Sequence, residues 1–308
     1  MWKFCKVRSP RSVYGPMVYI LSSGGKRVRP VLVLLACESV SGEWKPALPA
    51  ACAVEILHNF TLVHDDVMDN AGLRRGRPTI HTKWDTNVAI LTGDQMAACA
   101  YTMLMRSTTP RIRQVVGVFT RAFNEVCEGQ GLDQEFESRS RVGLHEYLRM
   151  IARKTGRVIA SSAEIGALIG QGTPRQVTAL RRFGEFLGLA FQIKDDLLDV
   201  TGDEREFGKK IGGDIVEGKK TFLLLRAYER ARGREKQILR RVMQHRTQDR
   251  ASVTTVRRIY ENLGILDEAE SMIRRCTHRA EHELARLPAR QSRDMLAWLS
   301  EQLRVRSV

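Results

Sequence analysis

Apolar residues recur at steps of three and four along most of the chain, and this spacing predicts helices. The segments Arg153–Gly170 and Gly184–Val200 follow it closely, whereas the alternation typical of strands is scarce. Short glycine- and proline-containing joints separate the helical segments, and no low-complexity linker divides the chain. The sequence therefore predicts an all-α helical bundle with a single domain over residues 1–308. The joints are Ser22–Pro30, Ala71–Thr79, Glu128–Asp133, Gln171–Arg175 and Phe207–Asp214.

The composition favours a folded protein in a reducing compartment. Hydrophobic residues make up 43% of the 308, enough for a large core. The longest apolar run near the N-terminus, Val31–Cys37, is too short to cross a bilayer, and no signal peptide pattern precedes it. The six cysteines are scattered without a C-x-x-C pair, which argues against a zinc site. We therefore expect a cytoplasmic protein with no transmembrane segment.

The net charge of +15 indicates an affinity for phosphate but does not identify the partner. Phosphate on nucleic acid, on lipid headgroups or on a small diphosphate would each be attracted. Many of the arginines in the C-terminal third have the spacing of solvated helix faces, so most of the excess is read as surface charge.

Two acidic clusters carry the clearest chemistry. The motif Asp-Asp-x-x-Asp occurs twice, 130 residues apart (195 minus 65), each time after an apolar stretch. Residues four apart share one face of a helix, so the first and last aspartates of each motif project together. Such hard oxygen ligands suit Mg²⁺, which leaves part of its shell to phosphate oxygens. One copy alone would often be an ordinary helix end, but two copies favour a magnesium cage for a diphosphate. The motifs are Asp65, Asp66, Asp69 and Asp195, Asp196, Asp199.

Basic residues gather in the joints close to these acidic clusters. Arginine offers forked donors to phosphate oxygens, and lysine offers a mobile point charge. Each basic pair alone is more often a surface feature, but their shared placement favours diphosphate binding. These residues are Lys26, Arg27 and Arg29 in the glycine-led turn, Arg74 and Arg75 after the first motif, Lys154 beside Thr155, and Lys209, Lys210, Lys219 and Lys220 after the second.

From about Ser22 to the C-terminus the motifs resemble those of the trans-isoprenyl diphosphate synthases, or polyprenyl synthetases. The matching stretches are GGKRVRP, EILHNFTLVHDDVMD, LRRGRPT, LTGD, GQGLD, RKTG, FQIKDDLLDVTGD and GKKIGGDIVEGKKT. The resemblance implies the all-α isoprenoid synthase fold, a homodimer, and a central cavity between the two aspartate-rich helices. It also implies head-to-tail condensation of isopentenyl diphosphate with an allylic diphosphate, aided by several Mg²⁺ ions.

The resemblance also implies roles for individual residues. Asp65, Asp69, Asp195 and Asp199 would ligate Mg²⁺, with Asp66 and Asp196 in support. Arg74, Lys154, Thr155, Gln192, Lys209 and Lys219 would hold the allylic diphosphate. Lys26, Arg29, His58 and Arg75 would hold isopentenyl diphosphate. On its own, a single histidine such as His58 is more often a core or surface residue, and its support is the spacing of seven residues before Asp65.

The resemblance also bears on the length of the product. The growing chain is expected to descend along the helix that precedes Asp65, where a bulky side chain would block it. Phe60 stands five residues before Asp65, and Thr61 stands four before it. One aromatic residue at the fifth place resembles the enzymes that make the twenty-carbon geranylgeranyl diphosphate. A farnesyl or longer product stays open, because Phe60 could equally be an ordinary core residue.

One departure from the family and three rival functions complete the interpretation. Family members usually have an additional helical segment before the GGKR turn, whereas residues 1–21 are atypical and do not read as a full amphipathic helix, so we expect either a shortened first helix or a recorded start that is internal. A class I terpene cyclase would share the fold and the first motif, but it has no need of GGKRVRP. A non-catalytic partner subunit would be expected to have lost aspartates, and none is lost. Nucleic-acid binding would explain the charge but not the two magnesium-type motifs, so we expect none.

Overall fold

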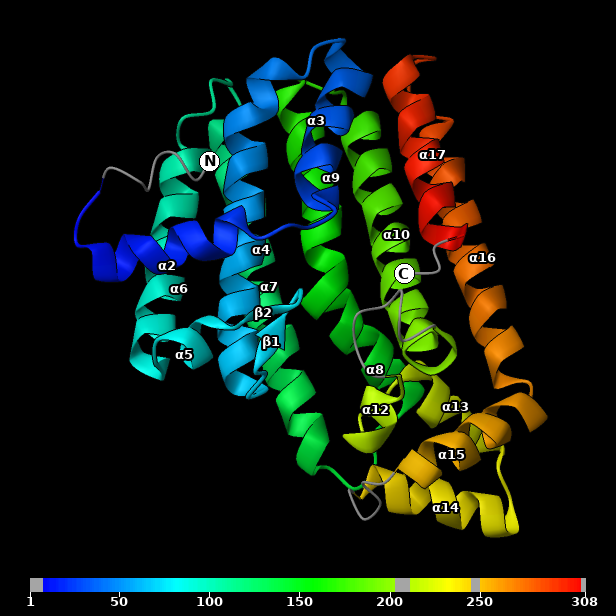
Figure 1. The fold of residues 1–308 in the computed structure, drawn as a ribbon. Helices are drawn as coiled ribbons and strands as arrows, with labels where there is room; N and C mark the ends of the chain where they lie inside the picture. The colour runs from blue at the N-terminus through cyan, green and yellow to red at the C-terminus, as the bar shows by residue number, and fades with distance from the viewer. Residues whose placement is uncertain (1–7, 203–210, 245–249, 306–308) are drawn as a thin grey trace. The chain divides into compact units, whose positions relative to one another are not determined.

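The computed structural model describes residues 8–202, 211–244 and 250–305. Helices make up nearly all of the regular structure in these ranges (Figure 1). Strands β1 (Leu73–Arg74) and β2 (Arg77–Pro78) form a single antiparallel hairpin, with Leu73 opposite Pro78 and Arg74 opposite Arg77. The all-α architecture expected from the hydrophobic spacing is therefore confirmed.

The helices in chain order are α2 (Arg11–Ser22), α3 (Val28–Ser41), α4 (Leu48–Met68), α5 (Ile80–Lys83), α6 (Thr86–Leu104), α7 (Ile112–Ser138), α8 (Leu144–Ile151), α9 (Arg157–Ile169), α10 (Pro174–Thr201), α12 (Gly213–Val216), α13 (Phe222–Arg230), α14 (Gly233–Met243), α15 (Arg250–Asn262), α16 (Ile265–Leu284) and α17 (Gln291–Val305). A 3₁₀ turn, η1 (Lys45–Ala47), precedes α4, and a π-turn, η2 (Ala152–Gly156), joins α8 to α9.

Residue contacts divide the chain into two compact units. The first comprises Met1–Phe123, Ser161–Thr178 and Pro288–Arg293, and the second comprises Asn124–Ala160, Ala179–Leu287 and Asp294–Val308. The single domain expected from the sequence stays a prediction.

Helix α4, which carries the first aspartate motif, lies in the core of the first unit. It packs chiefly on α6 and α3, and α2 packs on α6 (Figure 1). A close approach brings part of α9 against α3, because a Cβ on Gly166 would come within 2.2 Å of the Val33 carbonyl oxygen. Only glycine fits there. Within the first unit α4 thus packs on α3 and α6, and α3 packs in turn on part of α9.

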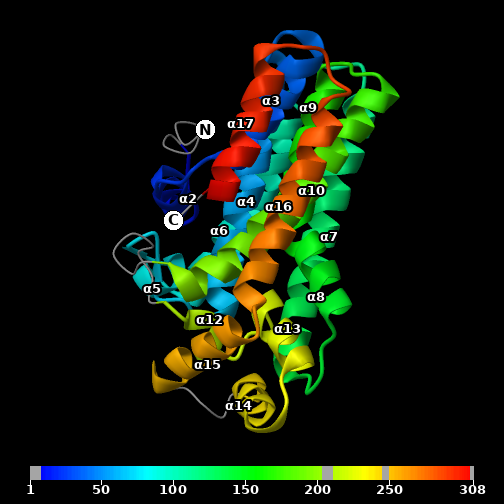
Figure 2. The same cartoon turned by 90° about the vertical axis from the view of Figure 1, so that its right-hand side faces the viewer.

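In the second unit, α10 carries the other aspartate motif and lies close to the π-turn. A Cβ on Gly188 of α10 would come within 2.5 Å of the Gly156 Cα. Helices α13, α15 and α16 pack on one another, and α14 packs on α13 and α15 (Figure 2). Their buried apolar side chains, among them Phe222 and Tyr260, form much of this unit's core.

Local signals explain where several helices begin and end. The Asp85 carboxylate accepts a hydrogen bond from the Val88 amide at 2.8 Å and caps α6. Helix α3 ends at Gly42, whose φ of 87° lies in the left-handed region. The atypical N-terminal segment is helical from Arg11, and α2 accommodates Pro16 within it.

Candidate active site

The first aspartate motif closes α4, and its three carboxylates differ in exposure. Asp65 is partly exposed, Asp69 is exposed at the helix end, and the two are one turn apart, with the Asp69 amide donating to the Asp65 carbonyl at 2.8 Å. Asp66 is buried, with 2% of its surface exposed. The outer two carboxylates are therefore accessible to a ligand, whereas the middle one points into the protein.

Asp66 fixes one of the predicted diphosphate ligands. Its carboxylate accepts a hydrogen bond from Arg74 Nε at 2.6 Å, which anchors the β1–β2 hairpin to α4. Burial raises the pKa of Asp66, and the charge of Arg74 opposes that rise. The neighbouring Arg75 has a left-handed φ of 53° and donates to the Gly24 carbonyl. The hairpin is thus tied down on two sides and presents Arg74 from β1 and Arg75 from the turn between the strands.

The residues predicted to hold isopentenyl diphosphate include a neutral histidine. Arg29 Nη1 lies 3.2 Å from His58 Nε2, and because a guanidinium only donates, this ring nitrogen accepts. Burial and the nearby arginines, Arg29 first, lower the pKa of His58 well below its ordinary 6.5. His58 therefore orients Arg29 without adding charge. Lys26 is exposed in the turn that precedes α3.

Arg27, which lies between Lys26 and Arg29 in the sequence, has a structural role. Its guanidinium pairs with the buried Glu55 and donates to the carbonyls of Leu21 and Ser23 at 3.1 and 3.0 Å. Glu55 also accepts from the Asn59 side-chain amide at 3.0 Å. Arg27 therefore holds the glycine turn to α4.

The second motif, on α10, repeats the arrangement of the first. Asp195 and Asp199 are partly exposed, and Asp196 is buried at 4% exposure. The Asp196 carboxylate accepts from the Tyr147 hydroxyl, from Gln192 Nε2 at 3.1 Å and from the Phe222 amide at 3.1 Å. Burial raises the pKa of Asp196 to about 7 in spite of these donors. In both motifs, therefore, the buried middle aspartate bonds to neighbouring protein groups, whereas the outer two carboxylates stay accessible.

Two predicted ligands of the allylic diphosphate, Lys154 and Thr155, lie on the π-turn η2. The Thr155 hydroxyl donates to Gln192 Oε1 at 2.8 Å, so it joins the network around Asp196. Lys154 Nζ lies 2.6 Å from Asp133 Oδ2. A π-turn is a one-residue bulge in a helix and is frequent at functional sites.

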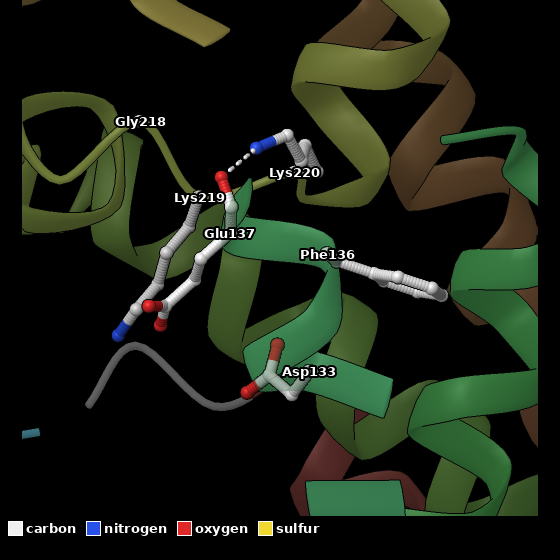
Figure 3. A pocket seen from close by; sticks show the side chains of 6 residues that line it. All are labelled: Asp133, Phe136, Glu137, Gly218, Lys219 and Lys220. Atoms are coloured by element: carbon white, nitrogen blue, oxygen red, sulfur yellow. Dashed lines mark hydrogen bonds between the residues drawn. The ribbon is translucent and has the colours of Figure 1, made fainter. Parts of the chain in front are cut away.

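Asp133 also lines a small pocket with Lys219, another predicted ligand (Figure 3). Figure 3 shows the side chains of Lys219 and Glu137 extending alongside each other, with Asp133 on the same side and Phe136 directed away. Lys220 is buried, donates to the Glu137 carbonyl at 3.0 Å and thereby fixes the backbone next to Lys219. Lys219 also pairs with Glu217 at 2.8 Å. The predicted ligand Lys209 lies outside the described residues.

Three residues of this region were not among the predicted site residues. Asp133 positions Lys154, and Tyr147 holds Asp196. The Asp214 amide donates to Asp199 Oδ2 at 3.1 Å, and burial together with the Asp199 charge raises the pKa of Asp214. The motifs GQGLD and IGGD contained a signal for the two aspartates, whereas nothing near Tyr147 marked it out.

The carboxylates fit a divalent metal whose shell is completed by other oxygens. Among the described residues, no three His, Cys, Asp or Glu side chains group closely enough to form a metal centre alone. Each motif nevertheless offers two accessible carboxylates one turn apart, which is the hard oxygen donor set that Mg²⁺ takes with water and phosphate.

Phe60, one of the two residues predicted to limit product length, lies in a cluster of aromatic rings. Phe60 is 7% exposed, and its ring meets those of His64 and Phe123 edge-on at 4.8 and 5.1 Å. We call Phe60, His64 and Phe123 the aromatic wall. A Cβ on Gly93 of α6 would come within 2.1 Å of His64 Nε2, so the imidazole fills the space over that glycine. The Thr61 hydroxyl donates to the His58 carbonyl at 2.8 Å.

The segment Lys45–Met68 is long and apolar enough to span a membrane by length and composition. However, 61% of its most apolar window is buried within the protein, as in a core helix.

Comparison with known proteins identifies the family. The polyprenyl synthetase pattern matches residues 10–262. The chain is 41% identical over 226 residues to a geranylgeranyl diphosphate synthase of Methanosarcina mazei, covering 73% of this chain and 70% of that one. It is 35% identical over 294 residues to a short chain isoprenyl diphosphate synthase of Methanothermobacter thermautotrophicus, covering 95% and 90%. A crystal structure of geranylgeranyl pyrophosphate synthetase from Pyrococcus horikoshii matches with a TM-score of 0.94 and 36% identity, over 99% of this chain and 93% of that one. The chain belongs to the polyprenyl synthetase family of prenyltransferases and has its all-α isoprenoid synthase fold.

Proposed function

We propose that the protein is a magnesium-dependent synthase that condenses isopentenyl diphosphate with an allylic diphosphate and releases geranylgeranyl diphosphate. One observation carries the proposal. In both aspartate motifs the outer carboxylates are accessible, and the buried middle carboxylate bonds to a residue predicted to bind the allylic diphosphate. That residue is Arg74 for Asp66 and Gln192 for Asp196.

The chain's own residues account for binding and for stabilisation of the leaving group. Arg74, Lys154 and Lys219 bring positive charge to the allylic diphosphate as its bond to carbon breaks, because donors fixed in advance stabilise charge best. Thr155 and Gln192 add neutral hydrogen-bonding groups. Mg²⁺ held by Asp65, Asp69, Asp195 and Asp199 would supply further charge neutralisation.

The second substrate is assigned to the other group of cations. Lys26, Arg29 and Arg75 bind the diphosphate of isopentenyl diphosphate, and neutral His58 holds Arg29 in place. The double bond of this substrate attacks the allylic cation, and the proton then lost is taken up by the released diphosphate. Because water would quench the cation, the apolar turns of α4 before Asp65 serve catalysis as well as folding.

The aromatic wall supports a twenty-carbon product. Phe60 lies on α4 slightly more than one turn before Asp65, where it would meet the end of the growing hydrocarbon chain. The relatives named as geranylgeranyl diphosphate synthases agree with this length.

The proposal includes a cytoplasmic homodimer. Helix α6 and the residue that follows it expose large apolar side chains that a second copy could cover, with Ile90, Leu91 and Met105 at 44%, 52% and 61% exposure. Light scattering on the purified protein tests this part, and a monomer at micromolar concentration would contradict it.

The decisive experiment combines purified protein, Mg²⁺ and labelled isopentenyl diphosphate with dimethylallyl, geranyl or farnesyl diphosphate in turn. We expect geranylgeranyl diphosphate from at least one primer, loss of turnover with EDTA and recovery with added Mg²⁺. Asp65→Asn and Asp195→Asn should each lower kcat by about a hundredfold or more, while Asp267→Asn in the first turn of α16 should not. Cyclised product from an allylic diphosphate alone would overturn the proposal in favour of a terpene cyclase.

A further inference from the structure

Tyr19 on α2 contacts the arginine hairpin at its second strand. Its hydroxyl donates to the Pro78 carbonyl at 2.8 Å. Pro78 pairs with Leu73 across the hairpin, one residue before Arg74. A single tyrosine thus connects the N-terminal helix to the strand pair that carries Arg74 and Arg75.

The ring of Tyr19 makes further contacts with the segment that follows the hairpin turn. The Arg77 guanidinium lies 4.4 Å from the ring centroid and Lys83 Nζ lies 4.8 Å from it, both within the range of cation–π attraction. The Trp84 ring meets it edge-on at 5.3 Å. Four contacts therefore converge on one side chain, and all of them come from residues 77–84.

The hairpin needs this support because it is very short. Each strand has two residues, and an isolated two-stranded hairpin is at best marginally stable in water. Asp66 secures the first strand through Arg74, and Arg75 reaches the Gly24 carbonyl. Tyr19 secures the second strand, so α2 and the turn after it hold the hairpin at two points.

We propose that Tyr19 is a positioning residue for the isopentenyl diphosphate subsite, which it serves by fixing the hairpin that presents Arg75. This inference rests on the proposed function, because it assumes that Arg75 binds that substrate. Helix α2 then supports a substrate-binding hairpin in addition to packing on α6.

The contacts predict that the two substrates respond differently. Arg74 is tied directly to Asp66 on α4, so its position depends little on Tyr19. Arg75 donates to the Gly24 carbonyl, so its position depends on the hairpin and on that backbone contact. Loss of the Tyr19 contacts should therefore weaken isopentenyl diphosphate binding while leaving the allylic diphosphate nearly unaffected.

The test compares three variants. Tyr19→Phe removes the hydrogen bond to Pro78 and keeps the ring, and Tyr19→Leu removes both. Tyr14→Phe is the matched control: it removes a hydroxyl from the same helix, one that accepts from Gln95 Nε2 at 3.4 Å on α6 and not from the hairpin.

Steady-state kinetics and trypsin digestion provide independent measurements. We expect the KM for isopentenyl diphosphate to rise about fivefold in Tyr19→Phe and about tenfold or more in Tyr19→Leu, with the KM for the allylic diphosphate within about twofold of wild type. Mass spectrometry should show faster cleavage after Arg74 and Arg75 in both variants, and Tyr14→Phe should match wild type in both measurements.

Equal KM values and equal cleavage rates in Tyr19→Leu and Tyr14→Phe would overturn the inference. A uniform loss of activity with both KM values unchanged would also overturn it, because that result indicates a purely structural role. If wild-type protein forms no condensation product, the proposed function fails instead. The cleavage rates then still report whether Tyr19 holds the hairpin.

Discussion

Replacement of Phe60 by alanine tests the product-length assignment most directly. The side chain is 7% exposed and contacts His64 and Phe123 through ring edges. Alanine removes the whole ring and leaves the backbone of α4 helical, because alanine is the best helix former. The change therefore opens the aromatic wall without moving the aspartates that follow it.

Two magnitudes decide what to expect. A buried Phe→Ala change costs about 3 to 5 kcal/mol of stability, and the lower end applies if neighbouring side chains close the gap. One further isoprene unit brings five carbons out of water, worth about 0.8 kcal/mol each and about 4 kcal/mol in total. That gain is large enough to shift the main product from twenty carbons to twenty-five or more.

The assay sizes the products by mass spectrometry after incubation with farnesyl and isopentenyl diphosphates, and thermal unfolding is measured alongside. Phe183→Ala is the matched control, because Phe183 is also buried, at 0% exposure, but lies in the second unit on α10. The control should lose similar stability and keep the twenty-carbon product. An unchanged product distribution in Phe60→Ala, despite a lowered Tm, would refute the assignment.

Three further substitutions test the electrostatics of the site. In wild type, the free energy of unfolding should fall as the pH drops from about 6.5 to 5, because the pKa of His58 is lowered on folding and only the unfolded chain binds a proton there. His58→Gln should flatten this pH dependence, measured by urea unfolding. Unchanged pH dependence would mean that His58 titrates normally. Asp133→Asn should raise the KM for the allylic diphosphate about tenfold, because the charge-assisted bond that fixes Lys154 is worth about 1.5 kcal/mol, and an unaltered KM would deny Asp133 that role. Tyr147→Phe should lower the free energy of unfolding by about 1 to 3 kcal/mol. The loss should be larger at pH 8 than at pH 6, because the pKa of Asp196 is about 7 and its ionised carboxylate needs the hydroxyl donor. Equal losses at the two pH values would count against this account.

The helices and the four outer aspartates could be predicted from spacing alone. Apolar steps of three and four fix a helix, and on a helix Asp65 and Asp69 must share a face, as must Asp195 and Asp199. The joints also showed where cations would gather. These features depend on local geometry, which a sequence expresses directly.

The partners of the middle aspartates could not be predicted, because they depend on the tertiary fold. Asp196 meets Tyr147, 49 residues earlier, and the Phe222 amide, 26 residues later. Arg27 appeared equivalent to Lys26 in sequence, yet it pairs with the buried Glu55. In each case the side chain's type was visible in the sequence, whereas its use was decided by distant residues. The catalytic assignments themselves stay predictions.

The π-turn at Ala152–Gly156 has a consequence for how this region could vary over evolutionary time. A π-turn holds one residue more than the α-helical turn it replaces, so deleting a single residue there would restore regular geometry. The shortened helix would form readily and could even be the more stable one. The helical segments on either side would keep nearly the same orientation, because the bulge takes up its extra residue locally. Lys154 and Thr155 lie within the bulge itself, however, and could not both keep their contacts with Asp133 and Gln192. A frame-preserving deletion in this segment would thus leave a folded helix and break the contacts that position two predicted ligands of the allylic diphosphate.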